Sequence, residues 1–95
     1  MRVLTPRTYR STIGIILDIL RIIKKHKCVT VSFLVRESNV PYVRLKPLLD
    51  KLKKGGYIIV KKTSQVDIAL TEKGLKLLAQ LELLKDTLGN IGIKI

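Results

Sequence analysis

Residues 31–58 contain the feature that most constrains the fold of this chain, namely two short helices joined by a tight turn. The turn is expected at Asn39, because asparagine tolerates the left-handed backbone conformation that a sharp reversal demands. Pro41 then suits the opening of the second helix, where its missing N–H would have no partner. An apolar stripe follows at three- and four-residue steps, formed by Leu45, Leu48, Leu49 and Leu52. The pattern predicts that the second helix buries this stripe and exposes Tyr42, Arg44, Lys46, Lys51 and Lys53.

One residue conflicts with a regular second helix. Pro47 falls inside it, where the ring removes a backbone hydrogen bond and clashes with the preceding turn. We therefore expect Pro47 to kink the helix or to confine residues 41–46 to a separate short turn. Either outcome would change how far the basic side of the helix can reach into a binding partner.

The charge balance indicates the kind of partner. Nineteen lysines and arginines oppose seven acids, which gives a formal net charge of +12 over 95 residues. Such a balance favours nucleic acid first, an anionic membrane surface second and an acidic protein third. A merely solvated surface is the alternative, although solvated surfaces usually mix both signs of charge.

The remaining elements follow from local patterns. Gly55-Gly56 ends the second helix, and β-branched residues in 57–62 and 66–70 predict a hairpin around a Ser64-Gln65 turn. Thr71 can cap a last helix that ends at Gly89-Asn90. The full predicted order is an extended arm at 1–9, a helix at 10–25, a short strand at 28–30, the helix pair, the hairpin, and a helix at 72–88.

That order, together with SNVPYVRLKPLLDKL, KGGYI and LTEKG, resembles winged helix-turn-helix DNA-binding proteins over about residues 10–80. The small size, basic charge and leucine-rich final helix look most like small archaeal winged-helix proteins. That group includes chromatin-type proteins that dimerise through an antiparallel coiled coil. The resemblance implies a mainly α fold with a small β wing (α+β). Its parts would be an N-terminal arm at 1–9, a winged helix-turn-helix domain at 10–71, and a C-terminal dimerisation helix with its tail at 72–95.

The resemblance also implies which residues contact DNA. Exposed positions early in the recognition helix of such proteins reach base edges, and here they include Tyr42, Val43, Arg44 and Lys46, with Lys51 nearer the DNA backbone. Arg44 can pair with guanine O6 and N7, or it can clamp a phosphate or remain solvated. Tyr42 either contacts DNA or covers the start of its helix. The other expected contacts are the wing residues Lys61 and Lys62, of which only one is expected to face DNA because neighbouring strand residues point to opposite faces, and Arg10, directly after the arm.

A homodimer is expected through the last helix. Leu77, Leu81, Leu84 and Leu88 repeat at the spacing of a coiled-coil seam, whereas Leu75 and Leu78 lie to one side and can pack on their own domain. The alternative is that all these leucines cover the core of one monomer. Because the seam spans fewer than two heptads, we expect the second apolar stripe of the first helix to join the interface through Ile15, Ile19 and Ile22.

Other function classes find little support in the sequence. A single histidine, His26, and a single cysteine, Cys28, cannot form the usual zinc arrangements, and the scattered acids indicate no catalytic pair. We expect no enzyme activity, cofactor, metal, membrane contact or small-molecule substrate. The expected partner is double-stranded DNA and the expected location is cytoplasmic, on the nucleoid. A protein-interaction module in a transcription or replication complex and an RNA-binding module remain the alternatives.

Overall fold

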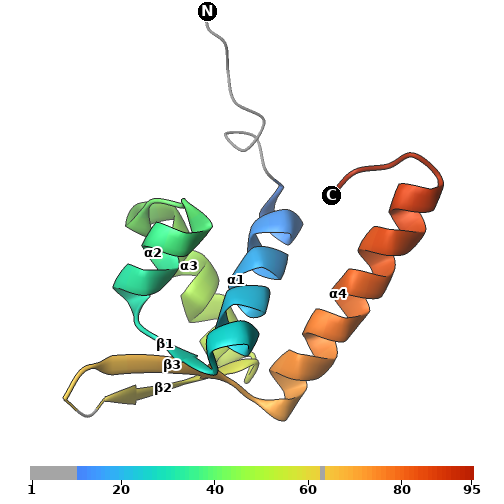
Figure 1. The fold of residues 1–95 in the computed structure, drawn as a ribbon. Coiled ribbons are helices and arrows are strands. Elements are labelled where there is room, and N and C mark those ends of the chain that lie inside the picture. The colour runs from blue at the N-terminus through green and yellow to red at the C-terminus, as the bar shows by residue number, and fades with distance from the viewer. Residues whose placement is uncertain (1–10, 63) are drawn as a thin grey trace, which may run out of the picture.

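The computed structural model describes residues 11–62 and 64–95, which fold into helices around a small sheet (Figure 1). The elements in chain order are α1 (Thr12–His26), β1 (Cys28–Val29), α2 (Val31–Ser38), α3 (Tyr42–Lys54), β2 (Ile58–Lys62), β3 (Val66–Leu70) and α4 (Glu72–Asn90). The predicted order of elements is confirmed. The predicted arm at 1–9 and the predicted contact Arg10 lie outside the described residues.

The three strands form one antiparallel sheet in the order β1-β3-β2. β2 and β3 are the predicted hairpin, with Val60 opposite Ile68 and Lys62 opposite Val66. The short β1 pairs with the other edge of β3 through Cys28 and Val29. Alternation along the strands turns Ile58 and Ile68 into the core, where they are 2% and 1% exposed. The sheet therefore ties the segment before α2 to the segment before α4.

Side-chain caps begin three of the helices. The hydroxyl oxygens of Ser11, Thr30 and Thr71 accept hydrogen bonds from the backbone N–H groups three residues later, at 2.9, 3.1 and 3.0 Å. The turn between α2 and α3 uses Asn39 in the left-handed conformation (φ 59°, ψ 35°), as its sequence position predicts. Val40 is buried directly after it. Local sequence chemistry thus sets the ends of the helices that frame the site.

Helix α1 lies at the centre of the molecule, between α2, α4 and β3 (Figure 1). Its buried residues are Ile15, Leu17, Ile19, Leu20 and Ile23. This corrects one expectation, because Ile15 and Ile19 are 1% and 0% exposed inside the subunit and cannot also contact a second copy. The sequence alone does not show that this stripe is covered within the subunit, because the covering elements are distant from it along the chain.

Pro47 does not divide the second helix of the pair. Helix α3 runs unbroken from Tyr42 to Lys54, so the expectation of a separate short turn at 41–46 is wrong. The proline removes only the bond that its N–H would donate to the carbonyl of Val43 in the first turn. Val43 is 80% exposed, so this carbonyl lies on a side of the helix that water can reach. The loss is therefore small enough for the helix to continue.

The end of α3 is joined to the start of α4 at the base of the hairpin. The Thr71 hydroxyl donates to the carbonyl of Gly56 at 2.6 Å, and the Lys73 ammonium donates to the carbonyl of Gly55 at 2.7 Å. The same ammonium lies 4.6 Å from the centre of the Tyr57 ring. Gly74 approaches so closely that a Cβ there would lie 2.1 Å from the Tyr57 carbonyl oxygen. These contacts, called the hairpin base below, join the segment that follows α3 to the start of α4.

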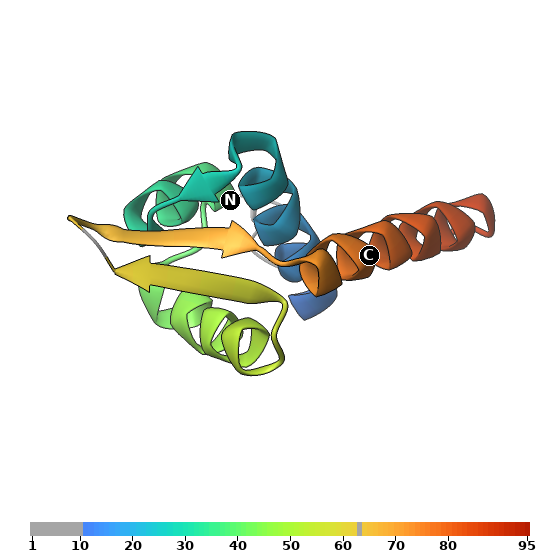
Figure 2. The same cartoon turned by 90° about the horizontal axis from the view of Figure 1, so that it is seen from below.

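Helix α4 projects from the domain in the direction opposite to the hairpin (Figure 2). Its first half packs inward through Gly74 and Leu78, and Leu77 and Leu81 are half-buried against the core. The ion pair of Arg21 with Glu82, at 3.0 Å, connects α1 to the middle of α4. Beyond it, Leu83 and Leu84 are 69% and 42% exposed. Leu75 is 44% exposed and does not pack on its own domain as the sequence suggested.

Candidate nucleic-acid interface

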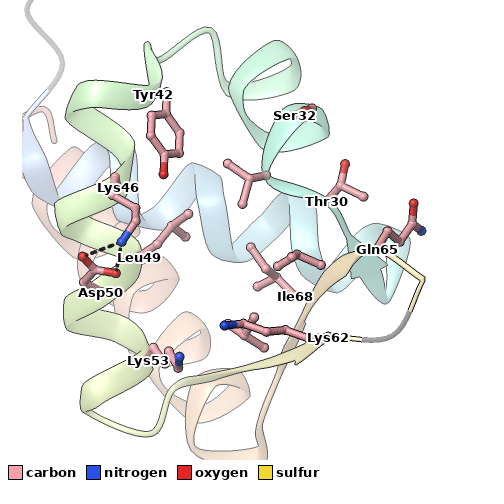
Figure 3. A pocket seen from close by; sticks show the side chains of 13 residues that line it. Thr30, Ser32, Tyr42, Lys46, Leu49, Asp50, Lys53, Lys62, Gln65 and Ile68 are labelled. Carbon is pink, nitrogen blue, oxygen red and sulfur yellow. Dashed lines mark hydrogen bonds and ion pairs between the residues drawn. The ribbon is translucent and has the colours of Figure 1, made fainter.

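A groove of about 650 Å³ runs between α3 and the β2–β3 hairpin, and the start of α2 closes one end of it (Figure 3). We call it the α3–hairpin groove. Leu49, Val60 and Ile68 contribute its apolar lining, and polar or charged side chains stand around them. Its other lining residues are Thr30, Val31, Ser32, Tyr42, Lys46, Asp50, Lys53, Lys62, Gln65 and Val66.

Helix geometry brings one series of α3 residues to this groove. An α-helix advances by about 100° per residue, so Tyr42 and Lys53 lie within roughly 40° of Lys46 around the helix axis. All three line the groove, and all three are exposed. The opposite wall supplies Lys62, whose side chain points from β2 towards α3 (Figure 3). Three ammonium groups from two elements therefore converge on one concave surface.

The start of α2 adds to the positive potential of the groove. Thr30, Val31 and Ser32 line it, and Thr30 is the N-cap of α2. The first N–H groups of a helix carry partial positive charge, and anions are stabilised beside them. The groove thus combines lysine side-chain charges from α3 and β2 with the positive end of the α2 helix dipole.

Asp50 lies on the same side of α3 as Lys46 and forms an ion pair with it (Figure 3). The Lys46 ammonium donates to both carboxylate oxygens, at 2.8 and 2.9 Å. This hydrogen bond raises the pKa of Lys46 above its ordinary value. Among the described residues that line the groove, Asp50 is the only acid.

The predicted DNA contacts divide between two sides of the molecule. Tyr42, Lys46 and Lys62 are brought together in the groove. Arg44 and Lys51 are exposed but lie roughly 140–160° around α3 from Lys46. Lys51 instead lines a second hollow, between α1, α3 and α4. Arg44 and Lys51 would therefore contact a different part of a bound partner from the part that Lys46 contacts.

The two adjacent wing lysines also point to opposite faces of the sheet. Lys62 pairs across the hairpin with Val66, which also lines the groove, whereas Lys61 pairs with Asp67. Asp67 lines a hollow on the other face, near His26 and Cys28. Residues directly opposite each other share a face, so Lys61 stands beside Asp67 and away from the groove.

Lys53 lines the groove although the DNA contacts expected from the sequence do not include it. Its position was visible in the sequence, because 42, 46, 49 and 53 are spaced by four, three and four residues and so share one side of a helix. Thr30, Ser32 and Gln65 were not identified either. They reach the groove only through the packing of α2 and the hairpin against α3, and no sequence spacing indicates that packing.

The described part of the chain contains neither a metal-binding cluster nor a membrane-spanning helix. Within residues 11–62 and 64–95, no three His, Cys, Asp or Glu side chains gather closely enough to hold a metal ion. No helix in the same residues combines the length and the apolar character that crossing a membrane requires.

Comparison with known proteins agrees with this architecture. The family model for the winged helix-turn-helix matches residues 9–89, which is most of the chain. The chain belongs to the winged helix-turn-helix family. In the terms of this family, α2 and α3 are the helix-turn-helix pair, α3 is the recognition helix and the β2–β3 hairpin is the wing.

A solved winged-helix neighbour is similar over most of its length. It is Sso10a-2, a DNA-binding protein from Sulfolobus solfataricus, with 26% sequence identity and a TM-score of 0.77. The alignment covers 86% of this chain and 85% of that chain, so the similarity extends over most of both chains. No curated protein matches the sequence at a significant level.

Proposed function

We propose that this winged-helix protein binds double-stranded DNA, with α3 in the major groove and the wing beside the adjacent backbone. The observation that carries the proposal is the convergence of Lys46, Lys53 and Lys62 on the α3–hairpin groove. A helix-turn-helix places its second helix in the major groove, and phosphates then lie along the sides of that helix. The description of Sso10a-2 as a DNA-binding protein and the net charge of +12 support the same function.

The contacts differ in kind along the interface. Lys53 and Lys62, which have no base-reading geometry of their own, are assigned to phosphates because an ammonium acts as a point charge. Tyr42 and Lys46 lie nearer the start of α3, where recognition helices meet base edges. Arg44 and Lys51, on the other side of α3, are assigned to the opposite strand across the major groove. The role is that of a nucleoid-associated protein or transcription regulator with limited sequence preference.

We also propose that the protein acts as a homodimer through the second half of α4. Leu84, which is 42% exposed, and Leu88, which is half-buried, continue the line of Leu77 and Leu81 along α4. Two copies joined there would carry two recognition helices on one assembly. Half-sites about 34 Å apart would then lie in successive major grooves on one side of the duplex.

Binding titrations with duplex DNA test the main proposal. The double variant Lys53→Gln/Lys62→Gln should weaken binding about tenfold per lysine at 0.1 M salt, for all sequences alike. It should also lower the slope of log affinity against log salt by about 2 per DNA-contacting subunit. Lys94→Gln, in the exposed tail after α4, is the control for a neutral substitution away from the groove.

Single-stranded DNA and duplex RNA, titrated in parallel, separate the alternatives. Preference for duplex RNA would replace the proposal with the RNA-binding function. Weak binding to all three nucleic acids with a flat salt response would replace it with the protein-interaction function, because charge would then contribute little.

A further inference from the structure

Asp50 is out of place in a surface that attracts phosphates. It is the one acid among the described lining residues of the α3–hairpin groove, and its side chain is 59% exposed. A carboxylate there repels DNA phosphates at every sequence, and it also occupies the ammonium of Lys46. Both effects lower the affinity for duplex DNA in general.

The fold gains little from this acid. An exposed ion pair between residues four apart on a helix stabilises the helix only slightly, because solvent screens it. Here the lysine precedes the acid, which is the weaker of the two orders. No backbone group, cap or core contact recorded for α3 depends on the Asp50 carboxylate. The reason for an acid at this position therefore lies in what the surface binds.

The ion pair places a hydrogen-bond acceptor beside a donor on the outer side of α3. In the major groove, a G·C pair presents the O6 and N7 acceptors of guanine next to the N4 amino donor of cytosine. A carboxylate can accept from the cytosine amino group while a neighbouring ammonium donates to guanine. The Lys46 Nζ and Asp50 Oδ1 atoms lie 2.8 Å apart. The guanine O6 and the cytosine amino nitrogen of one base pair are also separated by a hydrogen-bond distance, so the two side chains match the spacing of the two base groups.

We propose that Asp50 is a specificity-determining residue: it lowers affinity for duplex DNA in general and favours sequences that place a cytosine amino group opposite its carboxylate. This inference rests on the proposed DNA-binding function and adds a residue and a base to it. Lys46 takes part in this selectivity, because its ammonium is bonded to Asp50 and becomes available to bind a DNA phosphate when Asp50 is replaced. The Lys46–Asp50 pair therefore lowers the affinity for all duplexes and raises the selectivity at one base pair.

The test compares Asp50→Ala with Glu72→Ala, both measured in the full chain. Glu72 is a matched control, because it is also an exposed acid with a lysine partner four residues away, at 3.8 Å, but it lies on α4 outside the groove. Each protein is titrated with duplexes of unrelated sequence over a salt series, and each is used to select preferred sequences from a random duplex pool.

Asp50→Ala is expected to bind unrelated duplexes about tenfold more tightly than the unmodified protein at 0.1 M salt, with a salt slope steeper by about 1 per subunit. The selected sequences should lose a cytosine preference at one position, where the unmodified protein discriminates by about 5- to 150-fold. Glu72→Ala should match the unmodified protein in both measurements. In a Lys46→Met background, Asp50→Ala should steepen the salt slope less than in the unmodified chain, because only the repulsion of phosphate is then relieved and no lysine is released.

Three results would overturn the inference while leaving DNA binding intact. They are equal behaviour of Asp50→Ala and Glu72→Ala, tighter binding by Asp50→Ala with the base preference unchanged, and selected sequences of the unmodified protein without a cytosine preference. Absence of duplex binding by the unmodified protein would overturn the proposed function itself. Circular dichroism melts of both variants ensure that unfolding is not mistaken for lost selectivity.

Discussion

Helices α1 and α4 are both rich in large aliphatic residues, isoleucine and leucine in α1 and leucine in α4, yet they use these residues in opposite ways. Five residues of α1 are buried, whereas α4, which is longer, buries only Gly74 and Leu78. The difference arises from position in the fold, because α1 has neighbours on several sides and α4 leaves the domain after its first half (Figure 2). Apolar content alone therefore does not tell which helix forms the core and which can form an interface.

The largest expected contrast is between equal truncations in the two helices. Leu20→Ala in α1, where the side chain is 0% exposed, should lower the free energy of unfolding by about 2–5 kcal/mol because it leaves a cavity. Leu83→Ala in α4, at 69% exposed, should change it by about 0.5 kcal/mol or less. Urea denaturation of both variants measures the contrast. Similar losses would mean that α4 is covered in solution to the same extent as α1.

A smaller contrast is expected within α4 itself, between its fixed first half and its projecting end. Gly74→Ala should cost about 1–3 kcal/mol, because the new Cβ would displace the Tyr57 carbonyl and loosen the hairpin base. Gly89→Ala meets no atom within 4 Å and should stabilise the helix by up to about 1 kcal/mol. Thermal melts should therefore shift in opposite directions, and a shift of the same sign would contradict the assigned packing of Gly74.

The smallest expected effect on folding comes from a substitution at Leu84, the exposed member of the row Leu77, Leu81, Leu84 and Leu88 on α4. The same substitution should have a clear effect on dimerisation. Leu84→Glu should weaken dimerisation at least tenfold, which corresponds to about 1.4 kcal/mol, while the monomer keeps its fold. Leu83→Glu is the matched control, since the neighbouring residue lies roughly 100° away around α4. Sedimentation velocity distinguishes the two, and an unmodified protein that is monomeric at tens of micromolar would refute the dimer.

The sequence predicted those parts of the fold that depend on neighbours in the chain. Asn39 in the turn and Thr71 as a cap follow from side chains acting on their own backbone within a few residues. The burial of Leu45, Leu49 and Leu52 follows from helical spacing. The same local rules predict a kink or a separate short turn at Pro47, and the separate turn does not form, because the lost bond lies on an exposed side of the first turn.

The parts that were missed depend on contacts between distant segments. Ile15 and Ile19 are buried because other elements pack around α1, and the close approach of Gly74 to Tyr57 joins residues 17 positions apart. In the site, the basic residues of α3 were treated as one face, although Lys46 and Lys51 lie on different sides of the helix. Helical phase could have separated them, whereas the contribution of α2 to the groove required the tertiary structure.

The hairpin base has a mechanical consequence. Hydrogen bonds from Thr71 and Lys73 hold the hairpin where it meets α3 and α4, and the strands continue from there to the pair Lys62–Val66. A ribbon held at one end is a cantilever, so its deflection under load grows with distance from the support. The wing can therefore bend to follow a curved surface while the angle between α3 and α4 stays fixed.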